Sequence, residues 1–120
     1  MKWKTNKFLY LPLLFALGFL YSCEKETIKP IKVLTVSYSK DIQPIFTNKC
    51  IQCHDASMNP NLTSGNSYNS LTKGGFYNKA NPSQSIIYVQ ITTNASHIPR
   101  TSDVEKQKIL LWITLGAKND

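Results

Sequence analysis

The sequence lacks an apolar run that could cross a membrane. Its longest such run, FLYLPLLFALGFL, covers thirteen residues, 8–20, whereas a membrane-spanning helix needs about 20. The run follows a basic start that contains Lys2, Lys4 and Lys7. A short apolar run after a positive segment is typical of a secretory signal peptide. The alternative interpretation is a short membrane anchor that is never removed. We expect residues 1–22 to be a signal peptide.

Cysteine is also scarce, with three in the chain, and the first of them directly follows the signal. The segment LYSC, which ends at Cys23, resembles the lipobox of bacterial lipoproteins. The resemblance implies that Cys23 becomes the lipid-bearing N-terminus; the alternative is an ordinary signal peptide with a chance cysteine. Each buried CH₂ contributes about 0.8 kcal/mol, and stable anchoring requires more than one acyl chain. We expect a protein of the bacterial cell envelope, anchored in the lipid bilayer through Cys23 and facing the periplasm or the outside.

The sequence has no cluster of basic residues. The formal net charge is +7, and removal of the three lysines of the signal leaves +4 (7 − 3). A nucleic-acid surface gathers Lys and Arg on one face or along one helix, but the lysines here are scattered. We therefore expect no nucleic-acid partner.

The chain after residue 37 is poor in strand patterns and shows helical spacing instead. The segments that fit short helices are residues 41–50, a short stretch around 68–72, 82–94 and 102–116. The β-branched run 31–36 has no second strand to pair with, so we expect residues 23–37 to form a tether. Residues 38–120 should then form one small all-α domain.

Capping signals mark the ends of the predicted helices. Asp41 is a good N-cap for the first of them. Pro82 is suited to the first helical position after Asn81. Ser102 and Glu105 have the spacing of a capping box at the start of the last helix.

The connection over residues 55–81 is long and rich in Asn, Ser and Gly. A polar loop of this length is uncommon inside a small domain. It becomes reasonable if the loop wraps a large cofactor. A domain of this size also generally needs a metal, disulfides or a cofactor for firm stability.

The two remaining cysteines, Cys50 and Cys53, lie in the motif CIQCH, which His54 closes. A zinc site requires four ligands, and the adjacent Cys53 and His54 are poorly spaced for one. A thioredoxin-like pair belongs to a βαβ pattern, which is missing here. A disulfide between Cys50 and Cys53 closes too small a loop to stabilise much. The motif reads as covalent attachment of a c-type haem through both cysteines, with His54 as iron ligand.

Residues 38–120 resemble a small monohaem cytochrome c. The likeness is carried by SKDIQPIFTNKCIQCH, PSQSIIYVQI, the HIP turn and the closing WITLGAKND. It implies a cytochrome c-like fold of three to four short helices around one covalently attached haem c, with the first and last helices crossing. The residues expected to meet at the crossing are Ile42, Ile45 and Phe46 from one helix and Ile109, Trp112 and Ile113 from the other.

The second axial ligand is where the sequence departs from that family. The resemblance places a methionine before the proline that precedes the last helix, but Ile98 stands before Pro99 and cannot bind iron. His97 is the main candidate, since imidazole is a good ligand for haem iron. The other possibilities are Met58, which follows His54 by four residues on the proximal side, and no sixth ligand at all.

The expected function is electron transfer by a membrane-anchored monohaem cytochrome with other redox proteins as partners and no catalytic residues. Its iron would be held by His54, with His97 as the candidate distal ligand. We also expect the carbonyl of Pro60, or of a neighbour, to hold the other ring nitrogen of His54. The alternatives are a five-coordinate haem protein that acts as a small-ligand sensor or peroxidase-like enzyme, and a haem-free lipoprotein with a Cys50–Cys53 disulfide.

Overall fold

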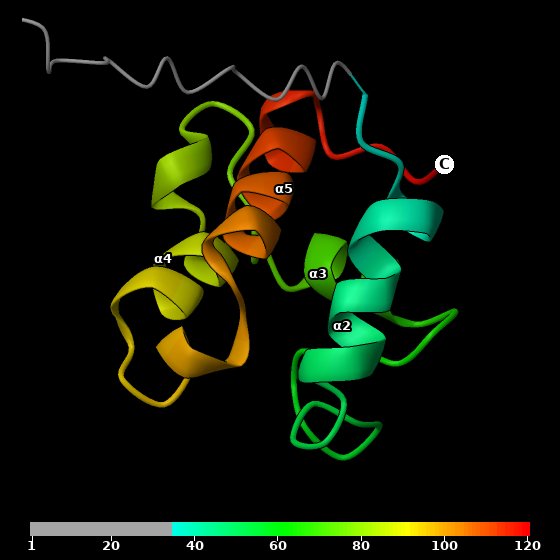
Figure 1. The fold of residues 1–120 in the computed structure, drawn as a ribbon. Coiled ribbons are helices and arrows are strands. Elements are labelled where there is room, and N and C mark those ends of the chain that lie inside the picture. The colour runs from blue at the N-terminus through cyan, green and yellow to red at the C-terminus, as the bar shows by residue number, and fades with distance from the viewer. Residues whose placement is uncertain (1–34) are drawn as a thin grey trace, which may run out of the picture. The chain divides into compact units, whose positions relative to one another are not determined.

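The computed structural model describes residues 35–120 (Figure 1). The predicted signal peptide, the predicted lipidation site Cys23 and the predicted tether up to residue 34 lie outside the described residues. Residues 35–120 are all-α, as predicted, and contain no strand. No helix in this part of the chain is long and apolar enough to cross a membrane.

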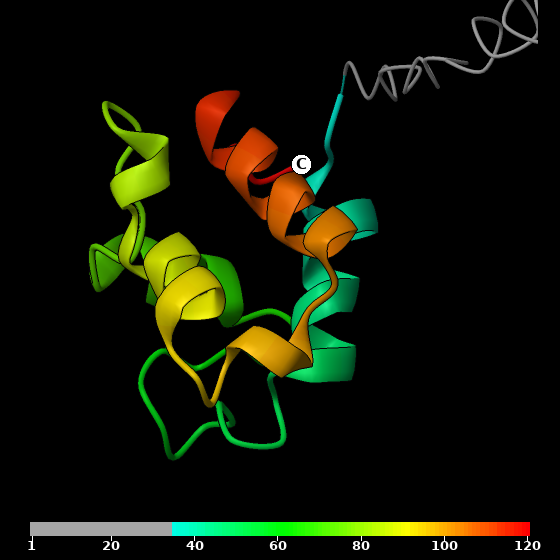
Figure 2. The same ribbon diagram turned by 60° about the vertical axis from the view of Figure 1, so that its left-hand side comes forward.

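Four short α-helices form the fold. They are α2 (Gln43–Lys49), α3 (Ser67–Lys73), α4 (Ile86–Thr93) and α5 (Asp103–Thr114). A π-helical turn, η2 (Tyr38–Ile42), continues directly into α2. The 3₁₀ turns η3 (Pro82–Gln84) and η4 (Ile98–Arg100) precede α4 and α5. Figures 1 and 2 both show the segment after α2 and the turn before α5 at the same end of the molecule.

The first helical segment begins earlier than predicted. The prediction of a start at Asp41 was wrong, because η2 begins at Tyr38 and Ser37 is its cap. Ser37 Oγ accepts the backbone N–H of Lys40 at 3.4 Å, and Asp41 Oδ2 accepts the backbone N–H of Ser37 at 3.0 Å. That N–H, together with a 3.2 Å ion pair to Lys108, lowers the pKa of the Asp41 carboxyl. Asp41 thus supports the cap from inside the first turn.

The C-terminal segment is joined to the start of this helix through Asp120. The backbone N–H of Tyr38 donates to Asp120 Oδ1 at 2.8 Å, and that of Ser39 donates to the Asp120 carbonyl oxygen at 2.9 Å. A carboxylate is stabilised at a helix N-terminus because unpaired N–H groups gather there. Asp120 therefore holds the end of the chain against the first helical turn.

The helix predicted from Pro82 is divided in two. Pro82 begins η3 after Asn81, but Ser85 has a ψ of 133° and interrupts the helix before Ile86. The Ser85 side chain is buried, and its Oγ accepts the backbone N–H of Asn78 at 2.9 Å. Serine side chains compete with helical hydrogen bonds in this way. The prediction of one continuous helix was wrong because the buried Ser85 makes a turn.

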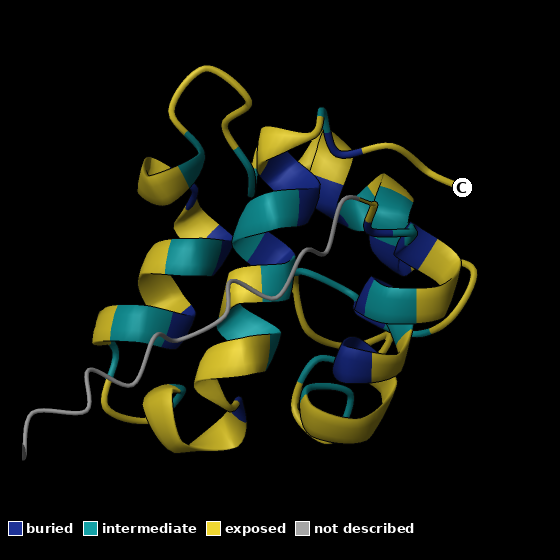
Figure 3. Cartoon of the chain, turned by 45° about the horizontal axis from the view of Figure 1, so that its top comes forward, coloured by how far each residue is buried: buried dark blue, intermediate teal, exposed yellow. Residues whose placement is uncertain are grey.

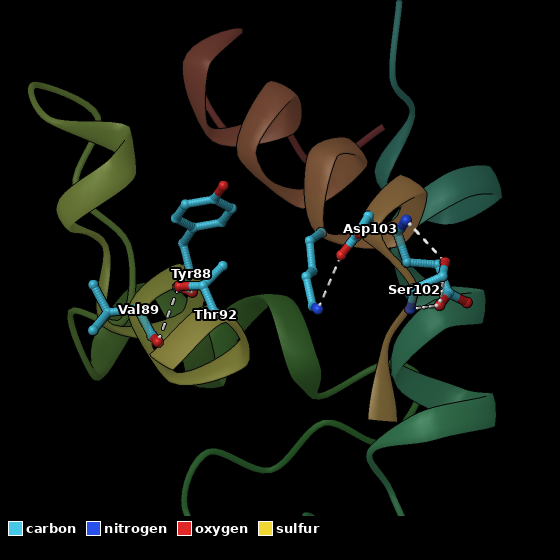
Figure 4. Close-up of polar contacts among 7 residues, drawn as sticks. Tyr88, Val89, Thr92, Ser102 and Asp103 are labelled. Atoms are coloured by element: carbon cyan, nitrogen blue, oxygen red, sulfur yellow. Dashed lines mark hydrogen bonds and ion pairs between the residues drawn. The ribbon is translucent and has the colours of Figure 1, made fainter. Parts of the chain in front are cut away.

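α5 begins with the predicted capping box (Figure 4). Ser102 Oγ accepts the backbone N–H of Glu105 at 3.3 Å, and Glu105 Oε2 accepts the backbone N–H of Ser102 at 2.7 Å. The bond from the Ser102 backbone is the main reason that the pKa of Glu105 is lowered. Gly116 follows the helix with a φ of +101°, a left-handed conformation that glycine adopts readily. Both predicted ends of this helix are confirmed.

The core lies between the helices, on the sides that face one another (Figure 3). Its centre is aromatic, since the ring of Tyr38 lies 5.2 Å from that of Trp112 and 6.3 Å from that of Phe46, centre to centre. Val36, which the sequence placed in the tether, is buried there too. The residues expected at the helix crossing, all buried in this one cluster, are Ile42, Ile45, Phe46, Ile109, Trp112 and Ile113. The packing places the end of α2 beside the start of α5.

Candidate functional site

A cavity of about 360 Å³ lies between the segment after α2 and the segment before α5. This volume is in the range of small-molecule and cofactor sites. Its polar and reactive lining includes Cys50, Cys53 and His54 on one side and Ser96, His97, Arg100 and Thr101 on the other. The apolar walls include Phe46, Leu62, Phe76, Ile87, Ile91 and Ile109. The four candidate haem residues of the described chain therefore meet at one apolar cavity.

The CIQCH motif forms a tight turn that continues from α2. The backbone N–H of Cys50 donates to the carbonyl of Phe46 at 2.9 Å, as in a helix. The backbone N–H groups of Cys53 and His54 then both donate to the Cys50 carbonyl, at 3.1 and 2.9 Å. The turn brings both sulfurs and the imidazole to the cavity. Both thiols are free in this structure.

The two thiols differ in environment. Cys50 is half-buried, and burial raises the pKa of its thiol to about 11, whereas Cys53 is exposed. A thiol becomes nucleophilic only as the thiolate. A buried thiol with a raised pKa stays protonated near neutral pH, so Cys50 is a weak nucleophile in this environment.

In haem-free protein we expect iodoacetamide at pH 8 to alkylate Cys53 well before Cys50. Cys50 should react quickly only as the pH approaches its pKa of about 11. Peptide mass spectrometry of samples quenched at successive times measures both rates, and alkylation in denaturant supplies the unprotected reference. Equal rates at pH 8 in the folded protein would contradict the buried position of Cys50.

The predicted contact between His54 and the Pro60 carbonyl is present. His54 Nδ1 lies 3.1 Å from the carbonyl oxygen of Pro60. Since a carbonyl can only accept, this contact requires a proton on Nδ1 and leaves Nε2 as the ring nitrogen without a protein partner. The backbone of the same loop is fixed by a 2.9 Å bond from Leu62 N–H to the His54 carbonyl. Such a partner orients a metal-binding histidine and raises its basicity.

His97 faces the same cavity from the segment between α4 and η4. Its ring centre lies 6.2 Å from that of His54, and the two ring planes are inclined by 40°. His97 Nδ1 is 3.1 Å from Ser96 Oγ. The backbone N–H of His97 donates to the Asn94 carbonyl at 2.9 Å, which holds the turn in place. Both histidines thus use Nδ1 for a protein contact and leave Nε2 for another partner.

Met58 also lines the cavity, but half of its surface is exposed. It follows the proximal His54 closely, and its backbone N–H donates to the Asp55 carbonyl at 3.3 Å within that same loop. His97 instead approaches from a different segment of the chain. Of the two candidates for the second axial position, the geometry favours His97.

The cavity residues do not form a closed metal site of their own. No three His, Cys, Asp or Glu side chains of residues 35–120 converge as a metal-binding group. The two cysteines and two histidines therefore do not form the tetrahedral cluster of a structural zinc site, which needs four ligands. A haem requires no such cluster, because the porphyrin supplies four nitrogens and the protein supplies only axial ligands.

Phe76 forms part of the apolar wall, and Gly74 allows it to do so. A Cβ added to Gly74 would lie 2.2 Å from Phe76 Cε2 and 3.0 Å from the Ser70 carbonyl. Gly74 has ordinary right-handed dihedral angles, so the need for glycine here is steric. The Phe76 ring thus lies against the backbone at the end of α3.

We expect Gly74→Ala to displace the Phe76 ring and to lower the free energy of unfolding by about 1–3 kcal/mol, the usual range for overpacking. Chemical denaturation measures the loss. A Gly74→Ala protein as stable as the wild type would show that the contact is readily relieved.

Sequence reasoning did not single out Thr101 or Gln90, which also line the cavity. No chemical role could be assigned to either residue from the sequence, and only the packing shows that both line the cavity. Among the described residues, no aspartate or glutamate lines the cavity, and Lys49 and Arg100 are its only basic residues. The site therefore brings two thiols and two imidazoles to one cavity with apolar walls. Comparison of the chain with models of protein families, with curated proteins and with solved structures gave no match.

Proposed function

We propose that this protein is a lipid-anchored monohaem c-type cytochrome that carries single electrons between redox proteins of the bacterial envelope. The observation that supports it most is the meeting of Cys50, Cys53, His54 and His97 at one apolar cavity. In this proposal residues 38–120 have a cytochrome c-like fold, and the lipid on Cys23 ties the domain to the bilayer.

The spacing of the two imidazoles suits one iron between them. With metal–nitrogen bonds of about 2.0–2.1 Å, two imidazoles that share a metal have ring centres about 6 Å apart. The ring centres of His54 and His97 are 6.2 Å apart. Both rings have their Nδ1 engaged, by Pro60 and by Ser96, so that Nε2 is the atom left for iron.

The chain's own residues would perform three tasks. Cys50 and Cys53 fix the haem through thioether bonds, and the Pro60 carbonyl keeps the His54 ring oriented. The apolar walls exclude water, which limits the reorganisation that accompanies a change of iron charge. The haem supplies the one-electron couple, and the protein sets its potential through axial ligands, hydrogen bonds and burial. A pair of histidines gives a lower potential than a histidine and a methionine.

A carrier role agrees with the residues that line the cavity. No carboxylate lines the cavity among the described residues, so an internal general acid or base of that kind is missing. Carrier function needs none, since no bond of a substrate is made or broken.

The test is to express the full-length chain in a bacterial host that attaches c-type haem, and to record the pyridine haemochrome spectrum of the purified protein. We expect one haem per chain with the spectrum of two saturated vinyl groups, and a protein mass raised by one haem. The control is Cys50→Ser with Cys53→Ser, which should lose the covalent haem. Folded wild-type protein that emerges colourless from such a host would refute the proposal.

A further inference from the structure

Two short turns of the domain are built alike, one in the loop after CIQCH and one in the loop after α4. In the first, Asp55 Oδ1 accepts the backbone N–H of Ser57 at 2.8 Å and its hydroxyl at 2.6 Å. In the second, Asn94 Oδ1 accepts the backbone N–H of Ser96 at 3.0 Å and its hydroxyl at 2.8 Å. Only the second serine also contacts a histidine, since Ser96 Oγ lies 3.1 Å from His97 Nδ1.

The orientation of the Asn94 side-chain amide is determined by its contacts. Its Oδ1 faces the backbone N–H of Ser96, which can only donate. Its Nδ2 donates to Gln90 Oε1 at 2.8 Å. A flipped amide would bring two donors together at the Ser96 N–H. The atom that meets the Ser96 hydroxyl is therefore a carbonyl oxygen, and it can only accept.

The direction of the next hydrogen bond follows from this orientation. The Ser96 hydroxyl has one hydrogen, which it donates to Asn94 Oδ1. It then has only lone pairs to offer to His97 Nδ1. Because two acceptors cannot bond to each other, the contact requires a hydrogen on His97 Nδ1. These three side chains form a relay in which His97 donates to Ser96 and Ser96 donates to Asn94.

The relay selects one of the two neutral forms of the His97 imidazole. Imidazole side chains in water carry their hydrogen mainly on Nε2, and a hydrogen bond at one ring nitrogen decides which form a protein holds. The relay favours the form with the hydrogen on Nδ1 and a lone pair on Nε2. The Pro60 carbonyl makes the same demand on His54, the other half-buried imidazole of the cavity. A metal shared by both rings requires this form of each.

We propose that Asn94 and Ser96 are positioning residues for His97, which hold its imidazole with the hydrogen on Nδ1 and the lone pair on Nε2. The purpose of this arrangement rests on the proposed haem, because it readies Nε2 to bind the iron. The arrangement itself does not, since every contact of the relay comes from the chain. The relay should therefore be present in haem-free protein. In haem-loaded protein the bond at Nδ1 should raise the basicity of His97 as a ligand.

The experiment uses full-length Cys50→Ser, Cys53→Ser protein, which should carry no haem, with ¹⁵N-labelled histidine at about pH 9, where histidine side chains are neutral. Two-dimensional NMR of the ring nitrogens shows which of them carries the hydrogen. We expect His97 to hold it mainly on Nδ1. Ser96→Ala should lower the ratio of the Nδ1–H to the Nε2–H form by roughly two- to tenfold, the factor that one hydrogen bond supplies. Ser96→Thr should retain the ratio.

Two further variants separate the relay from a general effect on the loops. Ser57→Ala is the matched control, because it removes the corresponding hydroxyl from the Asp55 turn, which contacts no histidine through that serine. It should leave the ratio at His97 unchanged. Asn94→Ala leaves Ser96 in place but frees its hydroxyl hydrogen to turn toward Nδ1. It should therefore shift His97 toward the Nε2–H form, whereas Asn94→Asp keeps an acceptor and should not.

The potential of haem-loaded protein gives a second readout. Loss of the bond at Nδ1 makes His97 a weaker donor to ferric iron, so Ser96→Ala should have a higher midpoint potential than Ser57→Ala. Equal ratios of the two forms in Ser96→Ala and Ser57→Ala would overturn the inference, as would a parent protein whose His97 is mainly Nε2–H. Haem-free protein without helical circular dichroism would overturn it too, because the relay would then depend on haem. The NMR result needs no haem, so it stands apart from any failure of the proposed function.

Discussion

Replacement of His97 with alanine should change the ferric haem from low-spin to high-spin. In the proposed cytochrome, His54 and His97 hold the iron from opposite sides, and their ring centres are 6.2 Å apart. Alanine cannot ligate, and Ile98 beside it offers no donor atom. Met58 lies on the loop of the proximal histidine. We therefore expect the axial position to be open to water and to small ligands.

Absorption and electron paramagnetic resonance spectra of purified protein measure the spin state, and the ferrous variant should bind carbon monoxide rapidly. Added imidazole should restore the low-spin spectrum, because it occupies the space of the missing side chain. Gln90→Ala is a matched control, since Gln90 lines the same cavity from α4 without a ligating group. A low-spin spectrum that survives in His97→Ala would show that another residue is the sixth ligand.

His97→Met tests the same position with a side chain that can bind iron. Methionine as sixth ligand raises the potential of a haem relative to histidine. If the variant remains low-spin, its midpoint potential should lie above that of the wild type in an equilibrium redox titration.

Replacement of Trp112 with alanine should lower the free energy of unfolding by about 3–5 kcal/mol, the usual cost of truncating a buried aromatic side chain to alanine. Trp112 is 1 % exposed, and its ring centre lies 5.2 Å from that of Tyr38 and 5.3 Å from that of Tyr77. Its Nε1–H donates to the Lys118 carbonyl at 2.9 Å. Alanine would leave a cavity between α5 and η2 and would remove one of the bonds that hold the C-terminal segment.

Urea denaturation of haem-loaded protein, followed by circular dichroism, measures this loss. Leu115→Ala is the control on the same helix end, because Leu115 is 44 % exposed, and exposed substitutions usually change stability by less than about 0.5 kcal/mol. Trp112→Phe keeps most of the packing and should fall between the two. A loss below about 1 kcal/mol in Trp112→Ala would mean that the core packs differently from the described one.

Local signals predicted the parts of the fold that depend on neighbours in sequence. The capping box of Ser102 and Glu105 was found because its two partners are three residues apart. The start of the first helix was not predicted correctly. Its first residues, Ser37 and Tyr38, also bond to Asp120, which lies far away in the sequence. Ser85 was missed for a similar reason, since its turn exists only when the side chain is buried against Asn78.

The same distinction between local signals and distant contacts applies to the candidate site. CIQCH and the Pro60 contact could be predicted because they lie in one short segment. That His97 faces His54 was only a hypothesis until the fold brought two segments together. The buried hydroxyl of Thr101, which has no hydrogen-bond partner among the described residues, had no signal in the sequence, because a threonine before a serine cap is ordinary and only packing makes it unusual.

The contact of Asp120 with η2 also makes the domain suitable for circular permutation. Since the backbone N–H of Ser39 bonds to the Asp120 carbonyl at 2.9 Å, a short Gly/Ser linker can span from the last residue to the start of the first helix. Circular permutation succeeds where ends lie close and new ends open in an exposed loop. Opening the chain at Gly65, which is exposed with free space around it, would place α3 ahead of CIQCH in the order of synthesis. Such a permutant would show whether the proposed haem attachment requires α2 and CIQCH to be synthesised before the other helices.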